Sequence, residues 1–448
     1  MVEGASLMKL SSFKHGSHPA EFKEYAEHKA LETIPIPVEV FIPINQHIGA
    51  PCKPVVKVGD EVKTGQLIAE STGFVSSNIH SSITGKVKKV GDFPHPNGTK
   101  SKMIHIVAEG DEEFVDIHDS NESWDQMDVA KLKSIIADAG IVGMGGAAFP
   151  TSVKVNPPKD KIIDTFIING CECEPYLTAD HRMMVEQTKE MIEGTQILMK
   201  TLDVEKAYIG IESNKPDAIE IMQKSTEHLP GISVVPVKVK YPQGAEKMLI
   251  KAVNGKEVPA GGLPMDIGCV VNNVGTAIAV YEAVVKKIPS IFRVVTVTGD
   301  AVENPKNVIA RIGTPFSKLI EFCGGLKPDT KKILMGGPMM GVAQYSLEVP
   351  VVKATSGILC LSTASVPYKE EYTCIVCGRC IHACPMFLVP TRISRSVDAG
   401  KYEMADELGI MNCIECGSCA YECPSNIPLV QRIRIGKNKI RELNNKKS

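Results

Sequence analysis

The sequence predicts a multidomain α/β protein that ends in a separate, cysteine-rich domain. With 448 residues, the chain is too long for one hydrophobic core, so we expect several domains of roughly 100–150 residues. Hydrophobic residues make up 43% and charged residues 23% of the chain, which is typical of a soluble globular protein. Eight of the 14 cysteines lie between residues 374 and 423, so we expect a C-terminal domain built around them.

The charge balance gives no reason to expect a polyanionic partner. The chain has 50 basic and 52 acidic residues, for a net charge of −2. No overall field therefore directs it to nucleic acid or to an anionic membrane surface. It has no run of about 18 apolar residues, and its start, MVEGASLMKLSSFKHG, lacks the apolar centre of a signal peptide. We expect a chain that neither spans a membrane nor is secreted, and that binds no nucleic acid.

One cysteine pattern, Cys-x2-Cys-x2-Cys-x3-Cys-Pro, occurs twice near the C-terminus. In a non-secreted chain such cysteines favour metal ligation over disulfides. Three cysteines at this spacing can bind three irons of one [4Fe–4S] cluster, and in two-cluster ferredoxins the last cysteine of each run binds the other cluster. The pattern therefore predicts an α-helical two-cluster ferredoxin domain. Its first cluster is expected on Cys374, Cys377, Cys380 and Cys423, and its second on Cys413, Cys416, Cys419 and Cys384.

The residues around each run fit the same interpretation. Pro385 and Pro424 turn the chain away after the fourth ligand, and Gly378 and Gly417 permit a close backbone approach to the cluster. A pair of zinc ribbons is the alternative, but such sites use two separated pairs of ligands and have no role for a third cysteine followed by x3-Cys-Pro.

A glycine-rich loop at residues 143–154 is the second candidate site. It contains a formal G-x-G-x-x-A match, which alone is a weak dinucleotide signal. The preceding residues 128–140 have the apolar spacing of an amphipathic helix rather than a strand, and Pro150 would interrupt the helix of a Rossmann loop. The small residues still allow backbone amides to approach a phosphate or a flat ring, with Lys154 near an anion. A plain turn between domains is the alternative.

Three ordered segments resemble the NADH-oxidising flavoprotein subunit of respiratory complex I. Residues 143–154 are similar to its FMN signature G-x-G-G-A-x-F-P-T-x-x-K, residues 168–175 to N-x-D-E-x-E-P, and residues 271–276 to V-N-N-V-E-T. The resemblance implies FMN contacts from Gly143, Gly145, Lys154, Asn169, Tyr241, Asn272, Asn273 and Thr276. It implies NADH contacts from Phe149, Glu172, Glu174 and Glu246. We assign no separate catalytic residue.

Departures from that pattern match a narrower family. Cys171 stands where complex I has Asp, Gly275 where it has Glu, and Ala245 where it commonly has Glu. These residues resemble the C subunit of the Rnf complex, a membrane-bound ferredoxin:NAD oxidoreductase that pumps Na+ or H+. Residues 13–19, FKHGSHP, are similar to the opening motif of that subunit, and residues 58–66 and 82–87 resemble the two halves of a lipoyl-like barrel.

The Rnf resemblance implies four domains in order. We expect an N-terminal segment with a barrel-sandwich hybrid over residues 1–115, an α/β FMN/NADH-binding domain over 125–290, a β-grasp soluble-ligand-binding module over 291–345, and the ferredoxin domain with a basic tail over 346–448. Residues 70–80 contain no Lys, so we expect the barrel to be a scaffold rather than a carrier of lipoate or biotin.

The resemblance also implies an oxidoreductase and translocase subunit. NADH delivers two electrons as a hydride while each cluster accepts one, so a flavin is expected between them. The sequence lacks a Ser/Thr-Gly-Ala-Thr acceptor motif, so we expect the FMN to be non-covalent. Partners would be the integral-membrane and peripheral Rnf subunits, with ferredoxin reached indirectly, and the chain would be peripheral on the cytoplasmic side of the cell membrane.

Two other functions fit the same motifs. One is a soluble Rnf-C-like NADH-dependent reductase that donates electrons to a cobalamin or amino-acid reductase. The other is an electron-relay protein with a decayed flavin site. The tail from residue 425 onward carries seven Lys or Arg and one Glu, which would suit an anionic partner or lipid headgroups, although such tails are more often solvated. Four isolated cysteines receive no role: Cys52, Cys269, Cys323 and Cys360.

Overall fold

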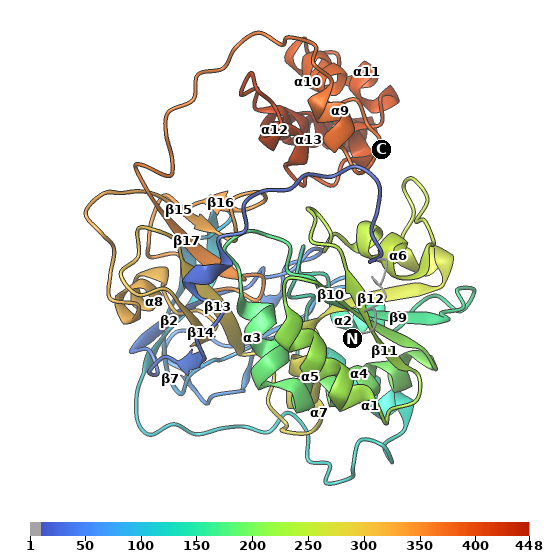
Figure 1. Cartoon of the computed structure of the whole chain (residues 1–448). Helices are drawn as coiled ribbons and strands as arrows, with labels where there is room; N and C mark the ends of the chain where they lie inside the picture. The colour runs from blue at the N-terminus through green and yellow to red at the C-terminus, as the bar shows by residue number, and fades with distance from the viewer. Residues whose placement is uncertain (1–9, 448) are drawn as a thin grey trace, which may run out of the picture.

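The computed structural model describes residues 10–447. Residues 1–9 and Ser448 lie outside the described residues. The expected absence of a signal peptide therefore concerns residues that are only partly described, as does the basic tail. Figure 1 shows a broad body built from three modules and, above it, a smaller helical lobe that carries the C-terminus. Within residues 10–447, no helix combines the length and apolar character needed to cross a membrane.

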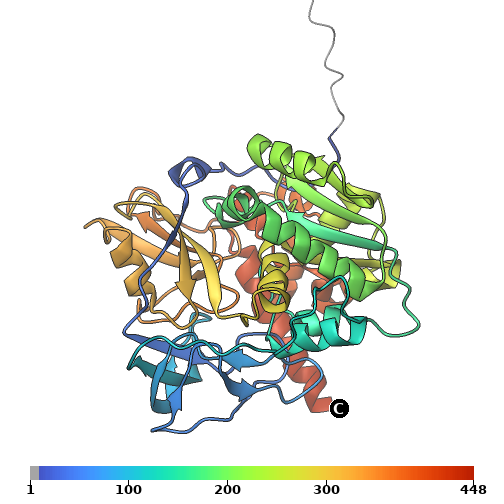
Figure 2. The same ribbon diagram turned by 90° about the horizontal axis from the view of Figure 1, so that it is seen from below.

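The first module is a sandwich of two small antiparallel sheets, drawn in blue in Figure 2. The four-stranded sheet has the order β2-β8-β7-β4, and the three-stranded sheet has the order β3-β5-β6. Gly85 must lack a side chain because a Cβ there would lie 2.1 Å from the Val107 carbonyl oxygen of the paired strand. The strands are β2 (Glu39–Pro43), β3 (Lys53–Pro54), β4 (Glu61–Val62), β5 (Leu67–Glu70), β6 (Ile79–His80), β7 (Gly85–Pro94) and β8 (Lys100–Ala108).

The tip of this sandwich, where a carrier domain would display its lysine, is packed against other modules. The Asn78 carbonyl oxygen accepts a hydrogen bond from Lys353 Nζ at 2.8 Å, and a Cβ on Gly140 would lie 2.1 Å from that same oxygen. Phe74 at the turn stays exposed. A tip held in this way fits the expected role of a scaffold.

The second module is a parallel sheet covered by helices, with strand order β11-β10-β9-β12. Strands buried on both faces read as continuous apolar runs, as in the sequence TFIING of β9. Its elements are α1 (Val129–Asp138), α2 (Thr151–Lys154), β9 (Thr165–Gly170), α3 (Ala179–Glu186), α4 (Thr188–Leu202), β10 (Ala207–Glu212), α5 (Pro216–Thr226), β11 (Ile232–Val237), α6 (Glu246–Asn254), η2 (Pro264–Ile267), β12 (Cys269–Asn273) and α7 (Val274–Val284).

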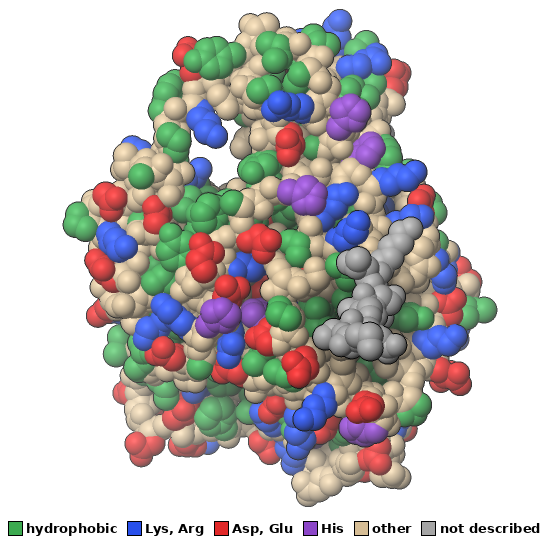
Figure 3. Space-filling view, viewed as in Figure 1, with side chains coloured by type: hydrophobic (Ala, Val, Ile, Leu, Met, Phe, Trp, Pro, Cys, Tyr) green, Lys and Arg blue, Asp and Glu red, His purple; other side chains and the backbone are tan. Residues whose placement is uncertain are grey.

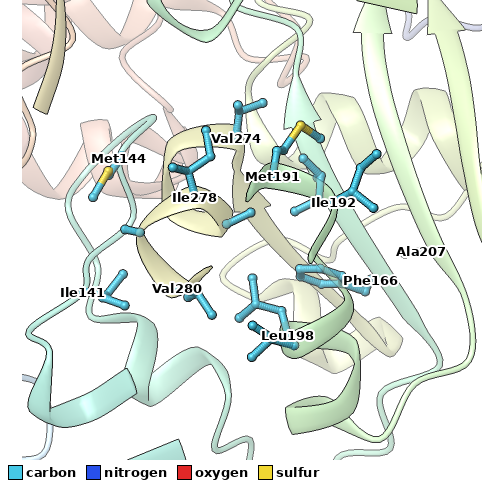
Figure 4. Packing of buried hydrophobic residues seen from close by; sticks show 14 of the residues in the cluster. Ile141, Met144, Phe166, Met191, Ile192, Leu198, Ala207, Val274, Ile278 and Val280 are labelled. Atoms are coloured by element: carbon cyan, nitrogen blue, oxygen red, sulfur yellow. The ribbon is translucent and has the colours of Figure 1, made fainter. Parts of the chain in front are cut away.

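The helix expected over residues 128–140 is present as α1. The Asp128 side chain caps it by accepting from Lys131 N, and Gly140 ends it at φ +67°. The core of this module joins α1, α4 and α7 to the sheet, and Figure 4 shows Phe166, Leu198 and Val280 meeting there. α4 and α7 touch closely because Gly194 has no side chain, since a Cβ there would lie 1.9 Å from the Ala277 carbonyl oxygen.

The third module is a six-stranded mixed sheet with the order β1-β14-β13-β17-β15-β16. Two of its strands come from outside the range expected for it: β1 lies before the sandwich, and β17 lies after residue 345. Both complete this sheet through parallel pairing, β1 with β14 and β17 with β13. The elements are η1 (Lys23–Tyr25), β1 (Leu31–Thr33), β13 (Phe292–Thr298), β14 (Lys306–Arg311), α8 (Phe316–Phe322), β15 (Thr330–Met335), β16 (Val342–Ala343) and β17 (Gly357–Ser362).

The helical lobe contains both cysteine runs, related by a local repeat. Gly378 and Gly417 stand at the same place in each run with positive φ, directly before α9 and α12. Val376 and Glu415, two residues earlier, also share positive φ, which is unusual for a β-branched residue. The elements are α9 (Arg379–Ala383), α10 (Pro390–Asp398), α11 (Tyr402–Glu407), η3 (Ile410–Asn412), α12 (Ser418–Tyr421) and α13 (Leu429–Lys447).

Candidate functional site

The glycine loop is a short, closed turn whose tip is open to solvent. Its ends pair, since Gly143 N donates to the Phe149 carbonyl oxygen at 2.8 Å. The tip residues Gly145, Gly146 and Ala147 are exposed, and a Cβ on Gly146 would meet nothing within 4 Å in the part of the chain that the structure describes. Backbone amides at this tip are therefore accessible to a ligand.

Two buried side chains hold the base of the loop. Thr276 Oγ1, in the first turn of α7, accepts from Met144 N at 3.1 Å. The guanidinium of Arg293, on β13 of the third module, donates to the Met144 carbonyl oxygen at 2.7 Å. Gly145 lies against Asn273, because a Cβ there would stand 2.8 Å from Asn273 Nδ2. The loop is thus positioned by the end of β12, the start of α7 and a neighbouring domain.

Asn272 provides the clearest evidence of a missing partner. Its side chain is 2% exposed, yet neither Nδ2 nor Oδ1 has a hydrogen-bond partner among residues 10–447. Within the described residues, Thr151 Oγ1, which follows the loop, is also buried without a partner. Buried polar groups are normally satisfied, and an isoalloxazine ring offers both donors and acceptors. These residues therefore fit FMN bound beside the glycine loop.

Lys154 ends the short helix α2 after the loop and lies at the edge of the sheet. Its Nζ donates to the Val271 carbonyl oxygen at 2.6 Å and lies 3.8 Å from Glu246 Oε2. An ammonium has three donors, so Lys154 keeps capacity for an anion. Glu246 opens α6 at the same place, which brings these two predicted site residues together.

Asn169 and the cysteines after it form a tight turn at the end of β9. Asn169 Nδ2 donates to the Gly244 carbonyl oxygen at 2.7 Å, and its Oδ1 accepts from Cys171 N at 3.2 Å. Cys173 Sγ accepts from Gly244 N at 3.2 Å. Burial raises the pKa of both thiols well above the usual range, so they are neutral groups that pack this turn. Asn169 thus makes two hydrogen bonds within the protein and keeps one N–H donor and one acceptor lone pair.

The Glu172 side chain caps helix α3. Its two carboxylate oxygens accept from Asp180 N at 2.8 Å and from His181 N at 3.1 Å, and Glu172 itself has φ +48°. A carboxylate at a helix N-terminus is stabilised by the free amides and the helix dipole. This gives Glu172 a structural role, and its predicted contact with NADH stays a prediction.

Asp180 is an unexpected member of the site. Its Oδ2 accepts from Asn273 Nδ2 at 2.6 Å, and the side chain lies near Glu172 and Arg293. Burial, and then the neighbouring Glu172 carboxylate, raise the pKa of Asp180 to about 7, although Arg293 acts in the opposite direction. Asp180 is therefore a titratable group directly beside a predicted flavin residue.

Glu174 and Tyr241 lie on the side of this module that faces the helical lobe. Glu174 Oε1 accepts from the backbone N–H groups of Met339 at 2.7 Å and Met340 at 3.0 Å. Burial raises the pKa of Glu174. The Tyr241 hydroxyl is buried and donates to the Cys416 carbonyl oxygen at 2.7 Å. Both residues thus join domains in this structure, and their predicted contacts with NADH and FMN stay predictions.

The second predicted cluster site is a cavity. Cys384, Cys413, Cys416 and Cys419 all line it, together with apolar residues that include Leu388, Ile393, Val430 and Ile433. Burial raises the pKa of Cys413 to about 11 and moves the pKa of Cys416 and Cys419 in the same direction. Ligation must therefore release protons from these thiols. Four cysteines around one cavity fit a [4Fe–4S] cluster.

The first predicted cluster site is assembled from both runs but is more open. Cys380 is buried and packs in one apolar group with Cys374 and Cys423. Burial is the main cause that raises the pKa of the Cys380 thiol, and the neighbouring Cys423 and Cys377 raise it further. Cys377 itself is exposed. The fourth cysteine of each run therefore lies with the opposite run, as the ferredoxin pattern predicts. In the part of the chain that the structure describes, no three His, Cys, Asp or Glu converge on a single metal ion.

Comparison with known proteins gives each module a counterpart. Family models match residues 11–113 as an RnfC barrel-sandwich hybrid domain, 136–282 as a Nuo51 FMN-binding domain, 294–343 as an SLBB domain, and 366–424 as a 4Fe-4S dicluster domain. The C subunit of the proton-translocating ferredoxin:NAD(+) oxidoreductase complex of Clostridium ljungdahlii is 52% identical, over 89% of this chain and 87% of that protein. This chain belongs to the RnfC family.

Other RnfC relatives cover nearly the whole sequence. The C subunit of the Na(+)-translocating complex of Acetobacterium woodii is 44% identical over 97% of this chain and 98% of that protein. The C subunit of the ion-translocating oxidoreductase complex of Rhodobacter capsulatus is 43% identical over 97% and 84%. A solved NAD+-reducing [NiFe]-hydrogenase is more distant, with a TM-score of 0.49 and 18% identity over 71% of this chain and 61% of that chain.

The matches confirm the predicted family, the order of the modules, and FMN with two [4Fe–4S] clusters as the cofactors of an RnfC chain. Sequence reasoning missed several site residues. Thr151 stands inside the signature of residues 143–154, so a weak signal existed for it. Asp180 and Arg293 lie outside those motifs and join the site only through the fold.

Proposed function

We propose that this chain is the NAD(H)-handling flavo-iron–sulfur subunit of a membrane-bound, ion-translocating ferredoxin:NAD oxidoreductase complex. It passes electrons between NAD(H), FMN and two [4Fe–4S] clusters, and partner subunits couple this transfer to ion translocation. The observation that carries the proposal is the combination, in one chain, of a glycine loop beside an unpartnered Asn272 and a cavity lined by four cysteines.

The chain's own residues have distinct roles in this proposal. The open tip of the glycine loop lets backbone amides approach the flavin, and Asn272 offers a donor and an acceptor to its ring. Lys154 supplies positive charge for the phosphate. When bound, FMN accepts a hydride as two electrons and releases them one at a time. Thr276 and Arg293 fix the loop so that the site is formed before the ligand arrives.

The remaining predicted contacts complete the proposal. Gly143, Gly145, Asn169, Asn273 and Tyr241 belong to the FMN side. NADH is proposed to bind beside Phe149, Glu172, Glu174 and Glu246. Cys374, Cys377, Cys380 and Cys423 bind one cluster, and Cys384, Cys413, Cys416 and Cys419 bind the other. We further propose that the chain is held peripherally at the cytoplasmic face by membrane subunits, and that ferredoxin meets the complex through another subunit.

Membrane fractionation tests the assignment to a complex. In the native host, the chain should sediment with membranes and copurify in mild detergent with integral-membrane subunits. A chain that stays in the high-speed supernatant without such partners would instead be a soluble reductase. The purified chain, loaded anaerobically, should contain about eight irons and one FMN that is released on denaturation, and NADH should bleach the flavin absorbance.

A further inference from the structure

The helical lobe touches the body of the molecule through a small set of contacts. In Figure 1 the N-terminal segment, in dark blue, passes directly beneath this lobe before it reaches the rest of the chain. That segment contains residues 13–19, a motif that the proposed electron path does not use. Figure 3 shows histidine side chains gathered near the seam between lobe and body.

The segment is attached to the flavin-binding module at Tyr241. Ser17 N donates to the Tyr241 carbonyl oxygen at 2.8 Å, and Tyr241 N donates back to the Ser17 carbonyl oxygen at 2.9 Å. Gly16 has φ +90°, and a Cβ there would lie 2.6 Å from the Tyr241 carbonyl oxygen, so only glycine fits. Lys240 Nζ fixes the start of the segment by donating to the Phe13 carbonyl oxygen at 3.1 Å.

From this position, the segment and Tyr241 reach both ligand loops of one cluster. The Tyr241 hydroxyl donates to the Cys416 carbonyl oxygen at 2.7 Å. His15 Nδ1 lies 3.2 Å from the Cys384 carbonyl oxygen, and because a carbonyl can only accept, Nδ1 carries the hydrogen. The two cysteines come from different runs but line the same cavity.

Three further contacts end on the same loops. Gly16 N donates to the Ala383 carbonyl oxygen at 3.2 Å, and Ser17 Oγ donates to Ser418 Oγ at 3.2 Å. A Cβ on Gly417 would lie 2.7 Å from the Met339 carbonyl oxygen, so the third module packs here as well. Met339 is itself held by Glu174, as described above.

The other cluster site faces away from this contact. Cys377 is exposed, and its neighbours Ile375 and Val376 are 67% and 81% exposed. Within residues 10–447, none of the hydrogen bonds between lobe and body described here ends on residues 374–380. The body therefore holds one ligand set and leaves the other open.

We propose that residues 13–19 and Tyr241 form a clamp that fixes the Cys384, Cys413, Cys416 and Cys419 ligand loops against the flavin-binding module. His15 and Tyr241 are its positioning residues. The inference rests on the proposed function, since it makes this ligand set the neighbour of the flavin and the Cys374 set the outward one. The chain after Tyr241 leads directly to Glu246, which lies 3.8 Å from Lys154 of the candidate flavin site.

The test uses the full chain, anaerobically loaded with iron and sulfide, and the variants Tyr241→Phe and His15→Phe. Both keep an aromatic ring and remove one hydrogen bond to a ligand carbonyl. Removing a donor dipole near the cluster should lower its reduction potential, measured by redox titration followed by electron paramagnetic resonance. Hydrogen exchange over residues 383–388 and 414–420 should rise about 10-fold, as expected for one lost buried hydrogen bond.

Tyr372→Phe is the matched control, since Tyr372 is 58% exposed and lies just before Cys374; it should change neither readout. Cys416→Ala identifies which resonance belongs to the clamped cluster. Unchanged potentials and exchange in both clamp variants, or a shift confined to the Cys374 cluster, would overturn the clamp. Neither readout needs flavin or NADH, so failure to bind FMN would refute the proposed function without touching this result.

Discussion

At the level of single residues, the candidate flavin site combines one titratable group with one unsatisfied group. Asp180 accepts from Asn273 at 2.6 Å and is partly buried near Glu172, while Asn272 has a buried amide with no partner among the described residues. Each has a cost for the protein alone, the first through a desolvated charge and the second through two lost hydrogen bonds. Residues that cost stability in this way are candidates for function.

Replacing Asp180 by Asn should flatten the pH dependence of stability. Because the pKa of Asp180 is raised to about 7, the folded state between pH ~4 and about 7 keeps a proton on Asp180 that the unfolded state has released. The stability from this group is complete below pH ~4 and is lost as the pH rises through about 7. The advantage of Asp180→Asn over the natural chain should grow from pH 5.5 to pH 8.5, reaching roughly 2–4 kcal/mol. Anaerobic thermal unfolding across this range measures it.

The control for this change is Asp160→Asn, because the Asp160 side chain is 76% exposed. The difference in stability between Asp160→Asn and the natural chain should be the same at every pH. An Asp180→Asn curve that also runs parallel would mean that Arg293 holds the Asp180 carboxylate charged throughout, and the assignment of the titration to Asp180 would be wrong.

Replacing Asn272 by Leu should separate stability from flavin binding. Without FMN, the variant should be as stable as the natural chain or more stable by about 1 kcal/mol, because a buried amide without partners is removed. Its affinity for FMN should fall at least about 10-fold, since a donor and an acceptor to the ring are lost. Fluorescence titration with FMN and thermal unfolding of the flavin-free chain give the two values.

Asn169→Leu is the matched variant with the opposite expectation for stability. Asn169 Nδ2 and Oδ1 both have protein partners, so its loss should destabilise the flavin-free chain. If Asn272→Leu also destabilised that chain and left FMN affinity unchanged, Asn272 would be an ordinary core residue.

The residue types at this site were predictable, but several of their contacts were not. The motifs identified Gly145, Lys154 and Asn272 because backbone approach, charge and amide chemistry follow from residue type. They could not show that Glu172 caps α3, because that depends on how the chain turns before the helix, or that Tyr241 reaches Cys416, because Cys416 is distant in sequence. An isolated Glu or Tyr carries no signal for a partner that the fold alone supplies.

At the level of elements, the two cysteine runs behave as one repeated unit with two different environments. Their spacing alone predicted the exchange of the fourth ligands, since three cysteines in one tight loop cannot complete a cluster. The spacing could not show that Cys377 is exposed while Cys416 and Cys419 are buried. That asymmetry accompanies the contacts with the body of the molecule, which reach the end of the first run at Ala383 and Cys384 and the second run at Cys416.

Single cysteine variants should therefore affect the two clusters separately. Cys377→Ala should remove the signal of the cluster on the Cys374 run and lower the iron content from about eight to about four, because the second cavity has no ligand from Cys377. Cys419→Ala should remove the other signal. Iron analysis with electron paramagnetic resonance of the reduced chain distinguishes the two. Loss of both signals from Cys377→Ala would show that the clusters do not form independently.

At the level of the whole molecule, buried cations join the modules by donating to backbone carbonyls. Lys23 Nζ donates to the carbonyl oxygens of Glu172, Glu174 and Leu177. Arg311, on β14 of the third module, donates to the carbonyl oxygen of Ser82 in the barrel. Each of these side chains donates to backbone carbonyl oxygens that are not paired within a helix or a sheet. Sequence patterns predicted the modules but not these joints, since a buried lysine looks like any surface lysine.

Lys353 joins the tip of the barrel to the residue that ends α1 before the flavin loop, and its loss should loosen two modules together. Its Nζ donates to the Asn78 carbonyl oxygen at 2.8 Å and to the Gly140 carbonyl oxygen at 2.5 Å, and burial lowers the pKa of Lys353 to about 8. Lys353→Met keeps the apolar stem and removes both hydrogen bonds. Hydrogen exchange should rise about 10-fold both at the barrel tip, residues 75–80, and at residues 139–146.

Because residues 139–146 include the first part of the glycine loop, Lys353→Met should also release FMN faster than the natural chain, which stopped-flow fluorescence would record. Lys332→Met, on the exposed side of β15, should change neither exchange nor FMN release. Faster exchange at the barrel tip alone would mean that the flavin loop is held by Thr276 and Arg293 without help from the barrel. Faster exchange at both places would establish the barrel as a structural support of the flavin site.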